Sequence, residues 1–201
     1  MMPGKAAIIW LALVAAIAVP LAIAANSPLL AWREPVYIVA GLAGVISMGC
    51  LLLQPLLAGG YLPGLSTRRG RRIHAMAGAV LVGAVIVHVV GLWITSPPDV
   101  VDALLFASPT PFSAWGVIAM WAIFAAAALA IFRRRIRPRL WRLGHTAVVT
   151  VAVLGSVAHA MLIEGTMGTI SKAALCLLAL GATAKVMSDL RVWRLVLRRR
   201  T

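Results

Sequence analysis

Six apolar runs, each long enough to cross a lipid bilayer, take up most of this chain. In hydrocarbon every backbone hydrogen bond must be satisfied internally, so a span of about 20 apolar residues folds as an α-helix. The runs cover approximately residues 6–25, 36–57, 73–94, 113–132, 143–163 and 169–187. Of the 201 residues, 62% are hydrophobic and 12% are charged. We therefore expect an all-α membrane protein, a bundle of six transmembrane helices in one domain, residues 1–201.

The net charge of +14 is concentrated in alternate connections between these runs. The basic connections and chain ends contain Lys5, Arg68, Arg69, Arg71, Arg72, Arg133, Arg134, Arg135, Arg137, Arg139, Arg142, Arg191, Arg194, Arg198, Arg199 and Arg200. The other connections contain Glu34, Asp99, Asp102 and Glu164, with Arg33 as a basic residue. By the positive-inside rule this pattern predicts an N-in, C-in topology. Contact with anionic lipid headgroups explains the arginines, and we expect no nucleic-acid binding.

The first run has two interpretations. Lys5, an apolar stretch and the residues AIAA before Asn26 resemble a secretory signal peptide. A signal peptide usually has an apolar region of about 7–15 residues, and the run here is longer. This favours a retained first span, with cleavage before Asn26 as the alternative.

Two local patterns predict where helices begin or bend. Pro20 and Pro55 lie within apolar runs and are expected to kink or end their helices. Ser96, Pro97 and Asp99 stand at positions typical of a helix N-cap, first turn and N3. We expect a short interfacial helix there, on the outer surface.

The four histidines of the chain form two pairs with the same spacing. His74 and His88 lie fourteen residues apart in the third run, and His145 and His159 lie fourteen residues apart in the fifth. Fourteen residues fall about 40° short of four helical turns, so each pair shares one helix face, with a rise of about 21 Å. Two such helices side by side would present histidine pairs at two depths, which suits two bis-histidine haems in a bilayer.

The predicted topology determines how these histidines pair between helices. The third and fifth spans both begin on the inner side and therefore run parallel. His74 and His145 then form an inner pair, and His88 and His159 form an outer pair. The third and fifth runs also show a weak similarity around their histidines, which a shared ligand role would explain.

A histidine that ligates iron is neutral, and its second ring nitrogen needs a hydrogen-bond acceptor that fixes the ring. The carbonyl four residues earlier in the same helix is a candidate acceptor. For His88 this is the carbonyl of Ala84, and for His159 it is that of Gly155.

Other readings of the histidines and of the sulfur-containing residues remain open. Histidines within a span can be packing residues or part of a proton relay, although a relay usually needs carboxylates and these two runs contain none. Met76, Met161 and Met167 are rival axial ligands. Cys50 and Cys176 lie in apolar runs, where free buried thiols are expected.

Haem propionates need cations or hydrogen-bond donors, and the chain offers several. Arg71, Arg72 and Arg142 lie just inside the inner pair, where they serve either as propionate partners or only as topology signals. On the outer side Lys172 is a candidate partner for a propionate or for Glu164.

Two histidines separated by thirteen residues on the third span, and two more on the fifth of six spans, resemble the ferric reductase-like transmembrane domain. Ferric reductases, NADPH oxidases and the bacterial haem-binding subunit of a periplasmic methionine sulfoxide reductase system share that domain. The resemblance extends over essentially the whole chain. It implies that His74, His88, His145 and His159 are the axial ligands of two b-type haems. It also implies a stand-alone subunit of the bacterial inner membrane.

The sequence departs from the larger members of that family in one respect. Ferric reductases and NADPH oxidases carry flavin- and nicotinamide-binding domains after the last span. Here an Arg-rich segment follows, without a Gly-rich nucleotide loop. We therefore do not expect this chain to take a hydride from NAD(P)H by itself.

Together these features predict a transmembrane electron carrier, an oxidoreductase component of the membrane. The expected donor is a cytoplasmic flavoprotein, a flavin (FMN or FAD) bound at the inner side, or a membrane quinol. The expected acceptor at the outer face is ferric iron, dioxygen or a periplasmic redox protein. Two alternatives remain: a quinol-oxidising dihaem cytochrome b subunit of a respiratory complex, and a membrane transporter or structural protein whose histidines pack or bind a metal such as zinc.

Overall fold

The computed structural model describes residues 3–190, and its regular structure in this range is helical throughout. Six long helices match the six apolar runs: α1 Pro3–Ala25, α2 Pro35–Ala58, α3 Thr67–Thr95, α5 Pro111–Ile131, α6 Pro138–Leu162 and α7 Thr169–Asp189. Three short elements connect them: the 3-10 helix η1 Pro28–Leu30, the helix α4 Pro97–Leu104 and the 3-10 helix η2 Phe132–Arg135. Each of the six long helices is long and apolar enough to cross a membrane. The predicted all-α fold with six membrane spans is confirmed.

Two helices begin several residues before their apolar runs. α3 starts at Thr67, where the Ser66 hydroxyl accepts a hydrogen bond from the Arg69 backbone N–H at 3.4 Å. α6 starts at Pro138, whose missing N–H costs nothing in the first turn. Hydropathy marks where a helix enters hydrocarbon, while capping marks where it begins. The arginines that immediately precede His74 and His145 are therefore helical and not part of a loop: Arg68, Arg69, Arg71 and Arg72 in α3, and Arg139 and Arg142 in α6.

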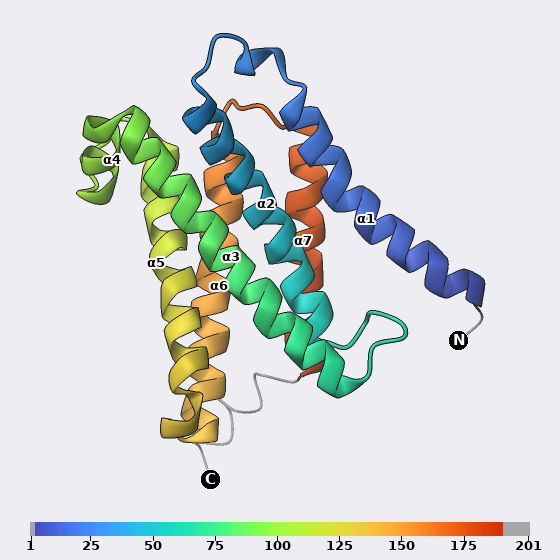
Figure 1. Ribbon diagram of the computed structural model, residues 1–201. Helices are drawn as coiled ribbons and strands as arrows, with labels where there is room; N and C mark the ends of the chain where they lie inside the picture. The colour runs from blue at the N-terminus through green and yellow to red at the C-terminus, as the bar shows by residue number, and fades with distance from the viewer. Residues whose placement is uncertain (1–2, 191–201) are drawn as a thin grey trace.

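The connections gather at two ends of the bundle (Figure 1). One end holds the α2–α3 turn and η2, with the arginine clusters of these segments, and we call it the basic end. The other holds η1, α4 and the α6–α7 connection, with Glu34, Asp99, Asp102 and Glu164, and we call it the acidic end. This separation agrees with the charge pattern used above, and the N-in, C-in orientation stays a prediction. The arginines of residues 191–200 lie outside the described residues.

The bundle is built on two antiparallel hairpins, α2–α3 and α5–α6, whose internal contacts are the most extensive between helices. Small residues let the helices of each hairpin approach closely. A Cβ on Gly91 would lie 2.7 Å from the Ala40 Cβ, and a Cβ on Gly155 would lie 3.2 Å from the Ala119 Cβ. α7 packs against both α2 and α6 and so joins the hairpins.

α1 is the peripheral helix of the bundle. Its N-terminal half diverges from the other helices (Figure 1), and its main contacts are with α2 and α7. Ile8, Leu11 and Val14 are 67%, 68% and 58% exposed, as suits a surface that faces lipid. The Trp10 indole N–H donates to the Pro63 carbonyl at 3.2 Å and ties the helix to the α2–α3 turn.

The short helix expected after Ser96 is present as α4 and lies at the acidic end. Ser96 is its N-cap, and the Ser96 hydroxyl donates to the Asp99 carboxylate at 2.6 Å. The two prolines within spans do not end their helices where they stand. α1 continues through Pro20 to Ala25, and α2 continues through Pro55 to Ala58.

Candidate functional site

The histidines nearest the acidic end face each other across the interior of the bundle. His88 comes from α3 and His159 from α6, so each hairpin supplies one ring. The ring centres are 6.4 Å apart and the ring planes are nearly perpendicular, at 81°. The phenyl ring of Phe112 lies edge-on to His159, at 5.9 Å between centres.

Each of these two rings is held by a backbone carbonyl of the neighbouring helix. Nδ1 of His88 lies 2.8 Å from the Ala40 carbonyl oxygen, and Nδ1 of His159 lies 2.8 Å from the Phe112 carbonyl oxygen. A carbonyl can only accept, so Nδ1 carries the proton in each ring. Nε2 of each ring then keeps its lone pair and is able to bind a metal ion.

The expectation that Ala84 and Gly155 supply these acceptors is wrong. Carbonyls within a helix already accept the backbone N–H four residues later. Each ring instead reaches across to the partner helix of its own hairpin, where Ala40 and Phe112 lie.

Two glycines make room for the same two rings. A Cβ added to Gly44 would lie 3.0 Å from Nδ1 of His88. A Cβ added to Gly116 would lie 2.6 Å from Nδ1 of His159. The imidazoles therefore rest directly against helix backbone, in space that any other residue type would fill.

The histidines nearest the basic end, His74 of α3 and His145 of α6, are held differently. Nδ1 of His74 lies 3.2 Å from the Gln54 carbonyl oxygen, and the Gln54 side-chain amide donates back to the His74 carbonyl at 3.2 Å. His74 and His145 lie on the same two helices as the acidic-end pair, one ring on each.

His145 depends on stacking more than on hydrogen bonding. Its ring lies parallel to the Trp141 indole, with centres 5.1 Å apart and planes 11° apart. Trp141 is fixed in turn, because its N–H donates to the Leu129 carbonyl at 2.8 Å and the Arg133 guanidinium lies over its ring. Nδ1 of His145 is buried and forms no well-aligned hydrogen bond with any described residue. The Ala126 carbonyl of α5 is a nearby but poorly aligned acceptor.

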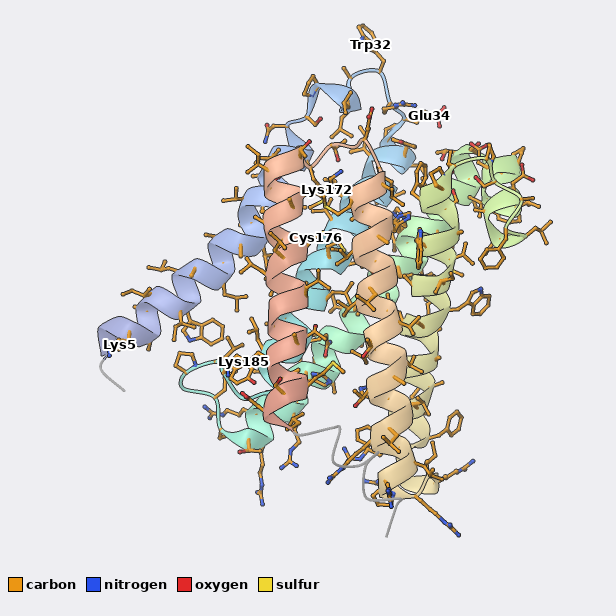
Figure 2. All side chains as sticks on the ribbon, turned by 180° about the vertical axis from the view of Figure 1, so that it is seen from behind. Lys5, Trp32, Glu34, Lys172, Cys176 and Lys185 are labelled. Atoms are coloured by element: carbon orange, nitrogen blue, oxygen red, sulfur yellow. The ribbon has the colours of Figure 1, made fainter. Side chains whose placement is uncertain are left out.

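A large cavity of about 1190 Å³ extends from the acidic end into the bundle and is lined by both His88 and His159. Lys172 of α7 also lines it and is only 8% exposed. Figure 2 shows Lys172 and Cys176 on the half of α7 nearer the acidic end. The Lys172 ammonium donates to the Ile163 carbonyl at 2.5 Å. The expected pairing with Glu164 is not formed, since the ion pair found among the described residues joins Lys185 and Asp189.

The other residues singled out in the sequence lie in varied surroundings. Arg72 and Arg142 are exposed in the second turns of α3 and α6, at the basic end with His74 and His145. Met76 and Met161 are 59% and 42% exposed on the bundle surface. Met167 is buried and lines the acidic-end cavity.

The alternative of a zinc site would need several Cys, His, Asp or Glu side chains close together. Cys50 and Cys176 are free thiols, as expected. Within residues 3–190 no group of three or more His, Cys, Asp or Glu side chains is placed to hold a metal ion. Zinc sites generally use three or four such protein ligands. His88 and His159 meet as a pair, and two axial side chains are a ligand set that haem iron takes in cytochromes.

Sequence reasoning singled out the four histidines, and their role as ligands stays a prediction. It missed the groups that hold their rings. The acceptors are backbone carbonyls of Ala40, Gln54 and Phe112, and a carbonyl leaves no trace in residue type. Gly44 and Gly116 did leave a signal, because each stands in the similar pentapeptides GVISM and GVIAM, residues 44–48 and 116–120.

Comparison with known proteins adds one finding to this geometry. Residues 40–156, more than half of the chain, match the family model described as ferric reductase like transmembrane component. The matched segment includes three of the four histidines and ends three residues before His159. No curated protein and no solved structure gave a significant match.

Proposed function

Because the chain belongs to the ferric reductase-like transmembrane family, we propose that it carries electrons across a membrane by means of two b-type haems. His88 and His159 would bind one haem, and His74 and His145 the other. When bound, the haem irons would supply one-electron chemistry by cycling between the ferric and ferrous states. The residues of the chain supply binding, orientation and the electrostatic surroundings.

The observation that carries this proposal is the geometry of the acidic-end pair. Two imidazoles that bind one metal ion from opposite sides, with bonds of about 2.0–2.1 Å, have ring centres roughly 6 Å apart. The ring centres of His88 and His159 are 6.4 Å apart. Both Nδ1 atoms are occupied by carbonyls, so each ring offers Nε2, and the adjoining cavity of about 1190 Å³ leaves room for a macrocycle.

The proposed second site rests on His74 and His145. They come from the same two helices as the first pair, one ring from each, and the same fourteen-residue interval separates them from it. Two ligand pairs at two depths, separated by about 21 Å along the helices, suit stepwise transfer across most of a hydrocarbon core of about 30 Å.

Cations at both ends of the bundle are suited to hold propionate groups. At the acidic end Lys172 is buried at the wall of the cavity. Its ammonium has three N–H donors, and one of them donates to the Ile163 carbonyl. At the basic end Arg72 and Arg142 extend from the second turns of α3 and α6, shortly before the histidines. We assign Lys172 to the acidic-end site and these arginines to the basic-end site.

We propose that electrons enter at the basic end and leave at the acidic end, in the bacterial inner membrane. The donor is a cytoplasmic flavoprotein, a bound flavin or a membrane quinol, and the acceptor is ferric iron, dioxygen or a periplasmic redox protein. An inside-negative potential favours this direction by about 2.3 kcal/mol per 100 mV for full transit. The arginine-rich basic end would attract an acidic flavoprotein by electrostatic steering.

The test is haem analysis of the purified protein. A pyridine haemochrome assay should give about two b-type haems per chain. A His88→Ala/His159→Ala variant should retain about one. A preparation free of haem under haem-replete expression, or unchanged haem content in that variant, would refute the proposal.

A further inference from the structure

The two hairpins repeat one arrangement of residues around their acidic-end histidines. The pentapeptides GVISM, residues 44–48 of α2, and GVIAM, residues 116–120 of α5, differ at one position and are offset by 72 residues. The carbonyl acceptors Ala40 and Phe112 have the same offset, and His88 and His159 are offset by 71. Each hairpin therefore carries a ring on one helix and its support on the other.

Each support has two components, a carbonyl and a glycine four residues later. Residues separated by four lie one above the other on one helix face. At Gly44, the nearest neighbours of an added Cβ are Nδ1 and Cε1 of His88, at 3.0 and 3.1 Å. At Gly116, they are Nδ1 and Cε1 of His159, at 2.6 and 2.8 Å. The same edge of each imidazole thus meets the glycine while its Nδ1 meets the carbonyl.

These glycines are distinct from those that only let helices pack. A Cβ on Gly91 would meet Ala40 and the Val36 carbonyl, and a Cβ on Gly155 would meet residues of α5. For Gly44 and Gly116, the three nearest atoms all belong to a histidine ring. Their missing side chains serve the imidazoles.

We propose that Gly44 and Gly116 are positioning residues, which set the orientation of the two acidic-end imidazoles so that Nε2 of each faces the other hairpin. The inference rests on the proposed function, because the value of that orientation lies in binding one iron between His88 and His159. A methyl group at either position would push the ring edge away from the helix. The push would lengthen the Nδ1 hydrogen bond and turn Nε2 from the shared axis.

The basic end supports this assignment by contrast. Four residues after the Gln54 carbonyl stands Ala58, and four residues after Ala126 stands Ala130. At that end the corresponding Nδ1 contact is longer, at 3.2 Å for His74, and a well-aligned bond is missing for His145 within the described chain. The short bonds of 2.8 Å accompany the glycines.

The test compares four glycine-to-alanine variants of the full chain in haem-replete cells. Gly44→Ala and Gly116→Ala place a methyl group against a ring. Gly83→Ala on α3 and Gly181→Ala on α7 are the controls, because a Cβ at either position meets nothing within 4 Å. All four substitutions raise helix propensity equally, so the controls separate contact with the ring from any change in the helix itself. The readouts are haem per chain, the low-spin EPR spectrum and the midpoint potential of each haem.

We expect a graded result at one site. Gly116→Ala, with the closer contact, should reduce haem content from about two to about one per chain. Gly44→Ala should keep both haems but shift the EPR signal and the midpoint potential of one of them. Both controls should match the wild type. If Gly116→Ala fails to fold, Gly44→Ala decides, because its neighbour needs to move by only a few tenths of an ångström.

Several outcomes overturn the assignment. Wild-type haem content with wild-type EPR spectra in both Gly44→Ala and Gly116→Ala would do so. Equal loss of both haems, or the same loss from the controls, would do so as well, since it indicates general disturbance. In each of these cases the wild type still binds two haems and the proposed function stands. A haem-free wild type overturns both.

Discussion

The two ends of the bundle hold their histidine pairs by different means. At the acidic end both rings rest on backbone, with Nδ1 contacts of 2.8 Å to carbonyls of the neighbouring helices. At the basic end the supports include side chains, the Gln54 amide and the Trp141 indole. Backbone in a helix has little freedom to move, whereas side chains change rotamer. The acidic-end rings therefore depend mainly on backbone, while the basic-end pair depends on side chains as well.

The largest expected effect comes from removing one ligand at each end. His159→Ala and His145→Ala should each lower haem content from about two to about one per chain, because b-type haems of this kind need both axial ligands. The reduced spectra of the two variants should differ and should sum to that of the wild type. Identical spectra would mean that the two sites are not distinct.

Removing the buried cation of the acidic-end cavity should change one site only. Lys172→Met keeps most of the side-chain volume and removes the positive charge. Loss of a nearby cation stabilises the ferric form, which bears one more positive charge than the ferrous form, so the midpoint potential of one haem should fall. Redox titration checks this, with the exposed Lys185→Met as a control that should leave both potentials unchanged. A higher potential, or an equal shift of both haems, would contradict the placement.

The Trp141 stack provides a test specific to the basic end. Trp141→Ala removes the ring that lies parallel to His145 at 5.1 Å and should cost about 0.5–1.5 kcal/mol of that contact. The basic-end haem should then dissociate sooner on dilution in detergent, while the acidic-end haem stays. Trp141→Phe should restore much of the retention. Equal loss of both haems would show that Trp141 supports the bundle in general.

A smaller effect is expected at Gln54. Gln54→Leu removes the hydrogen bond from the side-chain amide to the His74 carbonyl. It leaves the Gln54 backbone carbonyl that faces Nδ1 of His74. Loss of one such hydrogen bond costs about 0.5–1.5 kcal/mol. Thermal unfolding followed by haem release should show a slightly lower midpoint temperature. A complete loss of the basic-end haem would mean that the side chain does more than hold the backbone.

The smallest expected effect is pH-dependent and lies away from both sites. Tyr61 donates to the Asp189 carboxylate at 2.6 Å at the basic end. Burial and then this hydrogen bond raise the pKa of Tyr61 to about 12. Because the folded pKa lies above the ordinary value of about 10, the contribution to stability is complete below about pH 10 and is lost as the pH rises through the folded value. Tyr61→Phe should therefore be slightly less stable than the wild type at pH 8, and the difference should vanish above pH 12 in detergent unfolding measurements.

The two ends also differ in how much of their structure the sequence predicts. Hydropathy predicts the six spans. Helical periodicity, applied to the fourteen-residue spacing, predicts that the two histidines of each helix share one face. The acceptors depend on how far α3 is shifted along α2, and α6 along α5, which no residue type encodes. The sequence offers Lys172 as a candidate propionate partner on the outer side, but its contact with Ile163 depends on the path of the α6–α7 connection. The two glycines can be predicted from the sequence, because aligning the two hairpins places GVISM opposite GVIAM.

The hydrogen bonds from His88 and His159 to backbone carbonyls also determine whether protons can accompany the electrons. Nδ1–H of each ring is bound to a helix carbonyl. With haem bound as proposed, Nε2 would be bound to iron, and neither imidazole would have a nitrogen left to pick up or release a proton. Charge arriving at this end would therefore travel without accompanying H⁺. The conduit would be electrogenic, and any protonation of the final product would draw on water or groups beyond the membrane, not on the rings inside it.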